Sequence, residues 1–139
     1  MKKDRWLIAL AFFVHAVAWF LPVAKEGVRF PDALPGWQAF FIAVVGTQGP
    51  PWYEGLLSGM SALSTALFVL GAGWVAAIGS RKIRRVSAWI ALGAFVVNAH
   101  WIRFSGRIGL KIGYYLWWIS FLLLAMGLLR LSRATNNEG

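Results

Sequence analysis

The chain has 139 residues, of which 59% are hydrophobic and 16% aromatic, and its mean hydropathy is +0.63. A composition this apolar is unusual for a soluble domain and predicts an integral membrane protein. The formal charge is +9, but the Lys and Arg residues are divided among several short segments, which favours contacts with lipid headgroups and predicts no nucleic-acid partner. The chain has no cysteine, which excludes disulfides, thiol redox chemistry and thiolate metal sites.

Four apolar segments predict an all-α fold, a polytopic four-helix transmembrane bundle that forms a single domain over residues 1–139. The first segment, residues 6–24, follows a basic start and has no small-residue cleavage site after it, so we expect an uncleaved membrane helix. The other spans are predicted at residues 52–78, 86–102 and 112–131. Each reaches the length of about 17–25 residues with which a helix crosses a bilayer.

The segment between the first two spans is interrupted by Pro and Gly, which predict loops at residues 25–36 and 47–51. Residues 37–46 between these loops are apolar but too short to cross about 30 Å of hydrocarbon as a helix. We expect a short interfacial or re-entrant helix in the first outer loop. The sequence leaves both of these forms open.

The basic segment at residues 79–87 predicts the topology, because Lys and Arg are enriched in cytoplasmic loops. If both termini are cytoplasmic, nine of the 14 Lys and Arg residues fall inside and five outside. The short loop with Arg103, Arg107 and Lys111 is the part that opposes this assignment. We therefore expect a multi-pass protein of the bacterial inner membrane with both termini cytoplasmic and residues 25–54 on the outer side.

Polar side chains inside the predicted spans are the first candidates for a site. No Asp, Glu, Lys or Arg lies in the middle of a span, so we expect no catalytic activity and no carboxylate-driven proton exchange. His15, Thr65, Asn98 and Ser120 each belong to a stripe of small residues, the kind of face through which membrane helices pack. Their depths, counted from the cytoplasmic end, are roughly 13–20 Å. They predict one buried polar layer, which either joins the helices by hydrogen bonds or lines a binding site.

The two histidines raise the alternative of a b-type haem with His15 and His100 as axial ligands. His100 follows Asn98 by two residues, which is about 200° around a helix, and would lie roughly 7 Å farther out than His15. The spacing therefore places His100 apart, near the outer interface. We expect neither a cofactor nor a metal.

A second candidate site is the outer loop, because loops of about thirty residues are uncommon unless they bind something or cover a site. Its candidate binding residues are Trp37, Gln38, Phe41, Trp52 and Glu54. Trp117 and Trp118 lie about one turn too deep for an interfacial belt, so they suggest an apolar, aromatic-walled pocket beneath this loop. Such a pocket would suit a lipid tail, a quinone or a partner helix, and ordinary core packing is the competing interpretation.

These observations predict a non-enzymatic membrane protein that binds another membrane component, such as a lipid, another membrane protein or a copy of itself. It would act as an accessory subunit, an assembly factor or an immunity-type protein. Two alternatives stay open. One is a small oligomeric channel or carrier that uses the polar layer, and the other is an electron-transfer subunit that binds haem or quinone.

Overall fold

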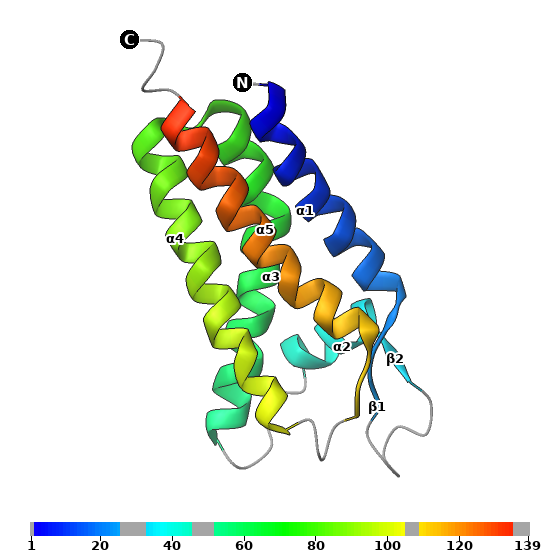
Figure 1. Cartoon of the computed structure of the whole chain (residues 1–139). Helices are drawn as coiled ribbons and strands as arrows, with labels where there is room; N and C mark the ends of the chain where they lie inside the picture. Colours follow the sequence, from blue (N-terminus) through cyan, green and yellow to red (C-terminus); the bar gives the residue numbers. More distant parts are fainter. Residues whose placement is uncertain (1, 26–32, 46–51, 105–108, 135–139) are drawn as a thin grey trace.

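The computed structural model describes residues 2–25, 33–45, 52–104 and 109–134, with the side chains of residues 2–4, 52–54, 103 and 104 left out (Figure 1). The described chain is mainly helical. Its α-helices are α1 (Lys2–Phe20), α2 (Gly36–Val45), α3 (Trp52–Ile78), α4 (Arg81–Asn98) and α5 (Ile112–Ala134), and a 3-10 helix, η1 (Ala99–Phe104), follows α4. Three short strands are β1 (Pro22–Lys25), β2 (Leu34–Pro35) and β3 (Gly109–Leu110). Two helical segments are long and apolar enough to cross a membrane, Gly55–Ile78 in α3 and Ile112–Ala134 in α5.

The four long helices α1, α3, α4 and α5 run side by side (Figure 1). Helix α5 packs against both α1 and α4, and α4 packs in turn against α3. The starts of α1 and α4 and the end of α5 lie at one end of the molecule, which we call the basic end, and α2, β1 and β2 lie at the opposite end, the sheet end (Figure 1). Helix α5 contributes more buried residues to the core than its neighbours, including Phe121, Leu124 and Leu128.

Close packing of α1 against α5 depends on small residues spaced by seven along α5. A Cβ atom at Gly127 would lie 2.7 Å from Cγ1 of Ile8, and a Cβ atom at Gly113 would lie 2.7 Å from the carbonyl oxygen of Pro22. Between these two points, His15 Nδ1 lies 2.9 Å from Ser120 Oγ. We call this contact the α1–α5 seam. Because the two glycines have no side chains, the backbone of α5 approaches α1 closely at Gly127 and the start of β1 closely at Gly113.

The remaining long helices are joined by aromatic side chains. Trp118 on α5 stacks on Phe95 of α4, with ring centroids 4.4 Å apart, and its Nε1 donates a hydrogen bond of 2.7 Å to the Phe95 carbonyl. Phe68 on α3 packs edge-on against Phe12 at 5.1 Å and against Phe121 at 5.3 Å. The core therefore combines contacts from α1, α3, α4 and α5.

A small antiparallel sheet caps one end of the helices, and the sequence did not predict it. Strand β1 is central, pairing with β2 through Ala24 and Leu34 and with β3 through Ala24 and Leu110. The helix expected at residues 6–24 ends instead at Phe20. Proline fixes φ and has no amide hydrogen to continue a helix, so Pro22 suits a strand at this point.

The other element boundaries agree in part with expectation. Helices were expected at residues 52–78 and 37–46 and are found at Trp52–Ile78 and Gly36–Val45. The basic segment is not a loop up to residue 87, because α4 begins at Arg81 with Ser80 as its N-cap, whose Oγ accepts a 3.4 Å bond from the Ile83 amide. The α-helix expected to reach residue 102 ends at Asn98 and continues as η1, and α5 extends three residues beyond 131.

The seam predicts opposite effects for the same substitution at two glycines. Gly127→Ala is expected to destabilise the protein by about 1–3 kcal/mol, because the added methyl group overlaps Ile8. Gly59→Ala, where a Cβ meets nothing within 4 Å, is expected to be neutral or to stabilise by up to about 1 kcal/mol through helix propensity. Thermal unfolding in a mild detergent, followed by circular dichroism, measures both. Equal stability of the two variants would contradict the seam.

Candidate functional site

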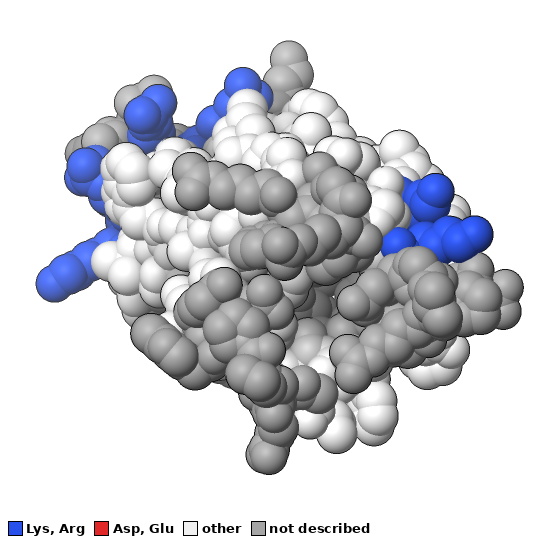
Figure 2. All heavy atoms as spheres, turned by 90° about the horizontal axis from the view of Figure 1, so that it is seen from below, with Lys and Arg blue, Asp and Glu red and all other residues white. Residues whose placement is uncertain are grey.

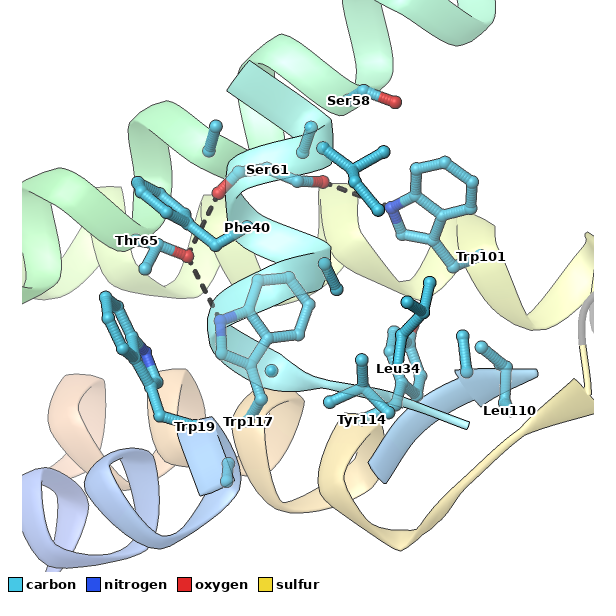
Figure 3. Close-up of a pocket in the computed structure, with 18 residues that line it drawn as sticks. Trp19, Leu34, Phe40, Ser58, Ser61, Thr65, Trp101, Leu110, Tyr114 and Trp117 are labelled. Carbon is cyan, nitrogen blue, oxygen red and sulfur yellow. Dashed lines mark hydrogen bonds between the residues drawn. The ribbon is translucent and has the colours of Figure 1, made fainter. Parts of the chain in front are cut away.

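A cavity of about 240 Å³ lies at the sheet end, between α2 and the strands on one side and the ends of α1, α3 and α5 on the other (Figure 3). We call it the sheet-end pocket. Its aromatic wall consists of Trp19, Phe40, Trp101, Tyr114 and Trp117. Small and aliphatic side chains complete the pocket, and Ser58, Ser61 and Thr65 add aliphatic hydroxyl groups. The pocket is therefore largely apolar and aromatic.

Two of the three pocket tryptophans, Trp101 and Trp117, donate hydrogen bonds to groups within the protein. Trp117 Nε1 donates to Thr65 Oγ1 at 3.1 Å, and Thr65 Oγ1 donates to the Ser61 carbonyl, also at 3.1 Å (Figure 3). Trp101 Nε1 donates to Ser61 Oγ at 3.1 Å. Because these two indole N–H groups are used to hold the wall together, their rings offer apolar surface to whatever occupies the pocket.

Asn98 joins three helices directly behind this wall. Its Oδ1 accepts a 2.5 Å bond from Ser61 Oγ, and its Nδ2 donates to Ser64 Oγ at 3.1 Å and to the Ala94 carbonyl at 2.8 Å. Tyr114 on α5 donates its hydroxyl proton to the Asn98 carbonyl at 2.6 Å. Asn98 is 1% exposed, and its amide is fully engaged on both sides, as a buried amide must be to avoid a desolvation cost.

His15 and Ser120 form a second polar pair, on the α1–α5 seam. Ser120 Oγ donates to the Trp117 carbonyl at 2.5 Å, so its proton is not available to His15. The 2.9 Å contact therefore needs the proton on His15 Nδ1, which leaves Nε2 as the unprotonated nitrogen. This Nε2 is buried without a hydrogen-bond partner among the described residues, and the ring stacks on Phe68 at 4.1 Å.

All four residues of the predicted polar layer are buried, but they lie in two hydrogen-bonded groups. His15 pairs with Ser120, and Thr65 and Asn98 are joined through Ser61. Trp117 connects the groups, because its indole donates to Thr65 and its carbonyl accepts from Ser120. Of the predicted four, Thr65 lines the pocket. Ser61 was not part of the predicted polar layer, although its position one turn before Thr65 puts both hydroxyl groups on one face of α3.

The three outer-loop candidates with described side chains lie outside the pocket. Trp37 and Phe41 are 49% and 64% exposed, Gln38 is half-buried, and none of the three lines the pocket. The side chains of Trp52 and Glu54 lie outside the described residues. One face of helix α2 points into the pocket instead, and it consists of Gly36, Ala39, Phe40 and Ala43. That i, i+3, i+4, i+7 spacing was the signal available in the sequence.

The two histidines lie in separate surroundings. His100, in η1, has its Nδ1 2.6 Å from the Val97 carbonyl, and its ring packs on Trp101 at 4.6 Å. His15 packs among Phe68, Phe121 and Trp19. Within the described ranges there is no cluster of three or more His, Cys, Asp or Glu side chains that could hold a metal ion.

No protein-family model, no curated protein and no solved structure matches this chain. The function is therefore inferred from the pocket, from the hydrogen bonds behind it and from the outer surface of the helices.

The hydrogen bond from His15 Nδ1–H to Ser120 Oγ predicts that the stability effects of substitutions at these two residues are coupled. Ser120→Ala removes the acceptor of His15 Nδ1–H and is expected to cost about 1 kcal/mol of stability. In a His15→Phe background, where the ring has no polar atom to leave unpaired, the same Ser120→Ala change is expected to cost less than half as much. A double-mutant cycle of thermal stabilities measures the difference. Equal costs in both backgrounds would mean that the contact contributes nothing.

Proposed function

We propose that this is a four-span membrane protein with both termini in the cytoplasm, that its whole length forms one domain, and that it binds an apolar part of another membrane component in the sheet-end pocket without catalysing a reaction. The observation that carries the proposal is the aromatic pocket, in which the indole N–H groups of Trp101 and Trp117 are paired within the wall. Such a site recognises its ligand by apolar burial and ring contact.

The outer surfaces of all four long helices support the membrane assignment. Large apolar side chains are exposed on each of them, for example Phe20 and Leu70 at 80%, Val96 at 64% and Ile119 at 44%. On α3 the exposed apolar positions extend from Leu56 to Ile78, a rise of roughly 33 Å, close to the thickness of about 30 Å of a bilayer's hydrocarbon core. Such surfaces are stable in lipid and costly in water.

Helix α4 begins with a basic turn and has only 18 residues, but together with η1 it is long enough to cross a membrane. Its 18 residues and the six residues of η1 rise together by roughly 39 Å. Its first turn carries the cluster Arg81, Lys82, Arg84 and Arg85, as expected for the cytoplasmic end of a span. This length supports α4 as the third span.

Aromatic residues and charges occur where the two membrane interfaces would lie. Trp6, Trp74 and Trp89 are exposed toward the basic end, and Trp37 and Tyr115 toward the sheet end. Lys25 and Lys111 are exposed at the sheet end, and Arg81 and Arg85 at the basic end. Figure 2, seen from the sheet end, shows Lys and Arg at the edges of the view. Amphipathic rings and cations prefer the headgroup level, so both features support two interfaces.

The size of the pocket supports binding of part of a larger molecule. Its volume of about 240 Å³ is below the range of about 300–1,000 Å³ that is usual for sites enclosing a whole small molecule. A segment of an acyl or isoprenoid chain, or one side chain of a partner helix, would fit. Helix α2 has no buried residue and is fastened by the stacking of Phe40 on Trp19 at 5.6 Å, so it would be the element that adjusts to the occupant.

The alternatives are less well supported. A channel or carrier would need polar groups available to its cargo, whereas Asn98 and Ser120 are engaged with other protein groups. A haem would need an open face at His15, whose ring is stacked on Phe68 and packed edge-on against Phe121. Binding of an apolar group is therefore the function best supported by the pocket.

Cysteine labelling tests the topology without background, because the chain has no cysteine. Ser80→Cys at the basic end and Ala33→Cys at the sheet end are both exposed positions. In intact cells, a membrane-impermeant maleimide is expected to label Ala33→Cys and to label Ser80→Cys only after lysis. The reverse pattern, or labelling of both in intact cells, would refute the topology, and release of the protein by alkaline carbonate would refute the membrane assignment.

Filling the pocket tests the binding site. Ala43→Phe, in the pocket wall, is expected to abolish the labelling of pocket peptides by phosphatidylcholine that carries a photoreactive diazirine in its acyl chain. Val44→Phe is the matched control, because Val44 is 60% exposed and lies outside the wall. Labelled peptides are identified by mass spectrometry, with exposed Leu70, which lines neither this pocket nor the cavity between α3 and α4, as the internal reference for lipid contact. If both variants retain wild-type labelling around Phe40 and Thr65, the pocket does not bind a membrane chain.

A further inference from the structure

A second cavity, of about 370 Å³, lies between α3 and α4. On α3 it extends from Met60 to Val75 and on α4 from Ser87 to Asn98, so its length is roughly 17–22 Å. Phe121, Leu124 and Leu128 of α5 form its base, and most of its surface is apolar. A Cβ atom at Gly71 or Gly93 would meet nothing within 4 Å, which shows that these positions face open space. We call this cavity the α3–α4 groove.

An arginine lies one helical turn beyond the basic end of the groove. Positions 84, 87, 91, 94 and 98 share one face of α4, and the last four line the groove, so Arg84 lies just beyond its end. An Nη atom of Arg84 reaches across to the Ala76 carbonyl on α3, at 3.5 Å, the limit of a hydrogen bond. Its Nε is buried with no hydrogen-bond partner among the described residues. The guanidinium thus has unused capacity to donate hydrogen bonds beside an apolar channel.

The charges around Arg84 favour an anion. Arg81, Lys82 and Arg85 are exposed in the same first turn of α4, which contains no acidic residue. The amino terminus of a helix is itself positive, so four cations placed there repel each other and the helix dipole. A phosphate placed beside them would relieve this repulsion.

We infer that the α3–α4 groove binds one acyl chain of an anionic phospholipid, whose phosphate contacts Arg84 and its neighbouring cations. The inference rests on the four-span arrangement proposed above. The groove is somewhat longer than half of the hydrocarbon thickness of about 30 Å, which is the depth available to one chain. Basic pockets between helices on the cytoplasmic side bind anionic headgroups in this way.

The charges at the basic end favour a lipid over a helix of a second copy. A second copy carries the same formal charge of +9, so it would bring further cations to Arg84. An anionic phospholipid brings the opposite charge, together with an acyl chain that suits the apolar groove.

Thermal unfolding of the whole chain in a neutral detergent tests the headgroup contact. Phosphatidylglycerol is expected to raise the unfolding temperature of the wild type more than phosphatidylcholine with the same acyl chains. Arg84→Gln is expected to weaken the apparent affinity for phosphatidylglycerol about five-fold, the effect of one cation near an anionic lipid. Arg130→Gln is the matched control, because Arg130 is an exposed cation on α5, outside the basic first turn of α4. Equal responses to the two lipids, or equal responses of the two variants, would overturn the inference.

Filling the groove tests the acyl chain separately. Gly71→Leu is expected to reduce the number of phosphatidylglycerol molecules retained in native mass spectrometry, whereas Gly59→Leu, at an open position outside the groove, is expected to retain them. Glycerol 3-phosphate, which has no acyl chain, is expected to give no stabilisation, and stabilisation equal to that by lipid would reduce the site to a phosphate site. A wild-type dimer that Gly71→Leu dissociates would assign the groove to a second copy. The groove and the sheet-end pocket are different cavities, so a negative result for lipid binding in the groove does not affect the proposal for the pocket. The maleimide experiment tests the topology independently of both cavities.

Discussion

The close approach of α1 to α5 is the contact on which the rest of the structure depends. Gly113, Ser120 and Gly127 are spaced by seven on α5, and they meet Pro22, His15 and Ile8, which are spaced by seven in the antiparallel direction. Because the end of α1 and the start of α5 are held together in this way, β1 and β3 lie side by side and pair. The sheet then holds β2 and the start of α2, whose Gly36 amide donates to the Leu21 carbonyl at 3.2 Å. The sheet-end pocket is the space enclosed by these contacts.

Local patterns predicted the helices well and the sheet not at all. A long apolar run is sufficient to indicate α3, and Pro and Gly on either side delimit α2. Strands of two to four residues carry no such pattern, and β1 exists because distant segments bring it partners. The start of α4 at Arg81 differs from the prediction for another reason. A dense group of charges between two apolar segments predicts a loop, but Ser80 is a good N-cap and long basic side chains are compatible with an exposed helical turn.

The candidate site was predictable where small-residue stripes revealed which face of a helix points inward. That reasoning selected His15, Thr65, Asn98 and Ser120, which are all buried. It could not show how they are connected, because Ser61 joins Thr65 to Asn98, and Trp117 on another helix links this pair to Ser120. In the outer loop, the prediction selected Trp37 and Phe41, whereas α2 lines the pocket with Ala39, Phe40 and Ala43. The size of a side chain does not show which face of a short apolar helix points inward, because Phe40 and Phe41 are identical in type and face opposite surroundings.

The pairing of His15 with Ser120 joins residues 105 positions apart, and this separation has a consequence for biogenesis. At about 5–20 residues per second, the ribosome delivers Ser120 roughly 5–20 s after His15. During that interval α1 has no α5 to pack against, and His15 lacks the Ser120 partner that it has in the complete structure. Strand β1 likewise lacks its partner β3. Helix α1 is therefore made before α5 but reaches its final packing only after α5 has been made.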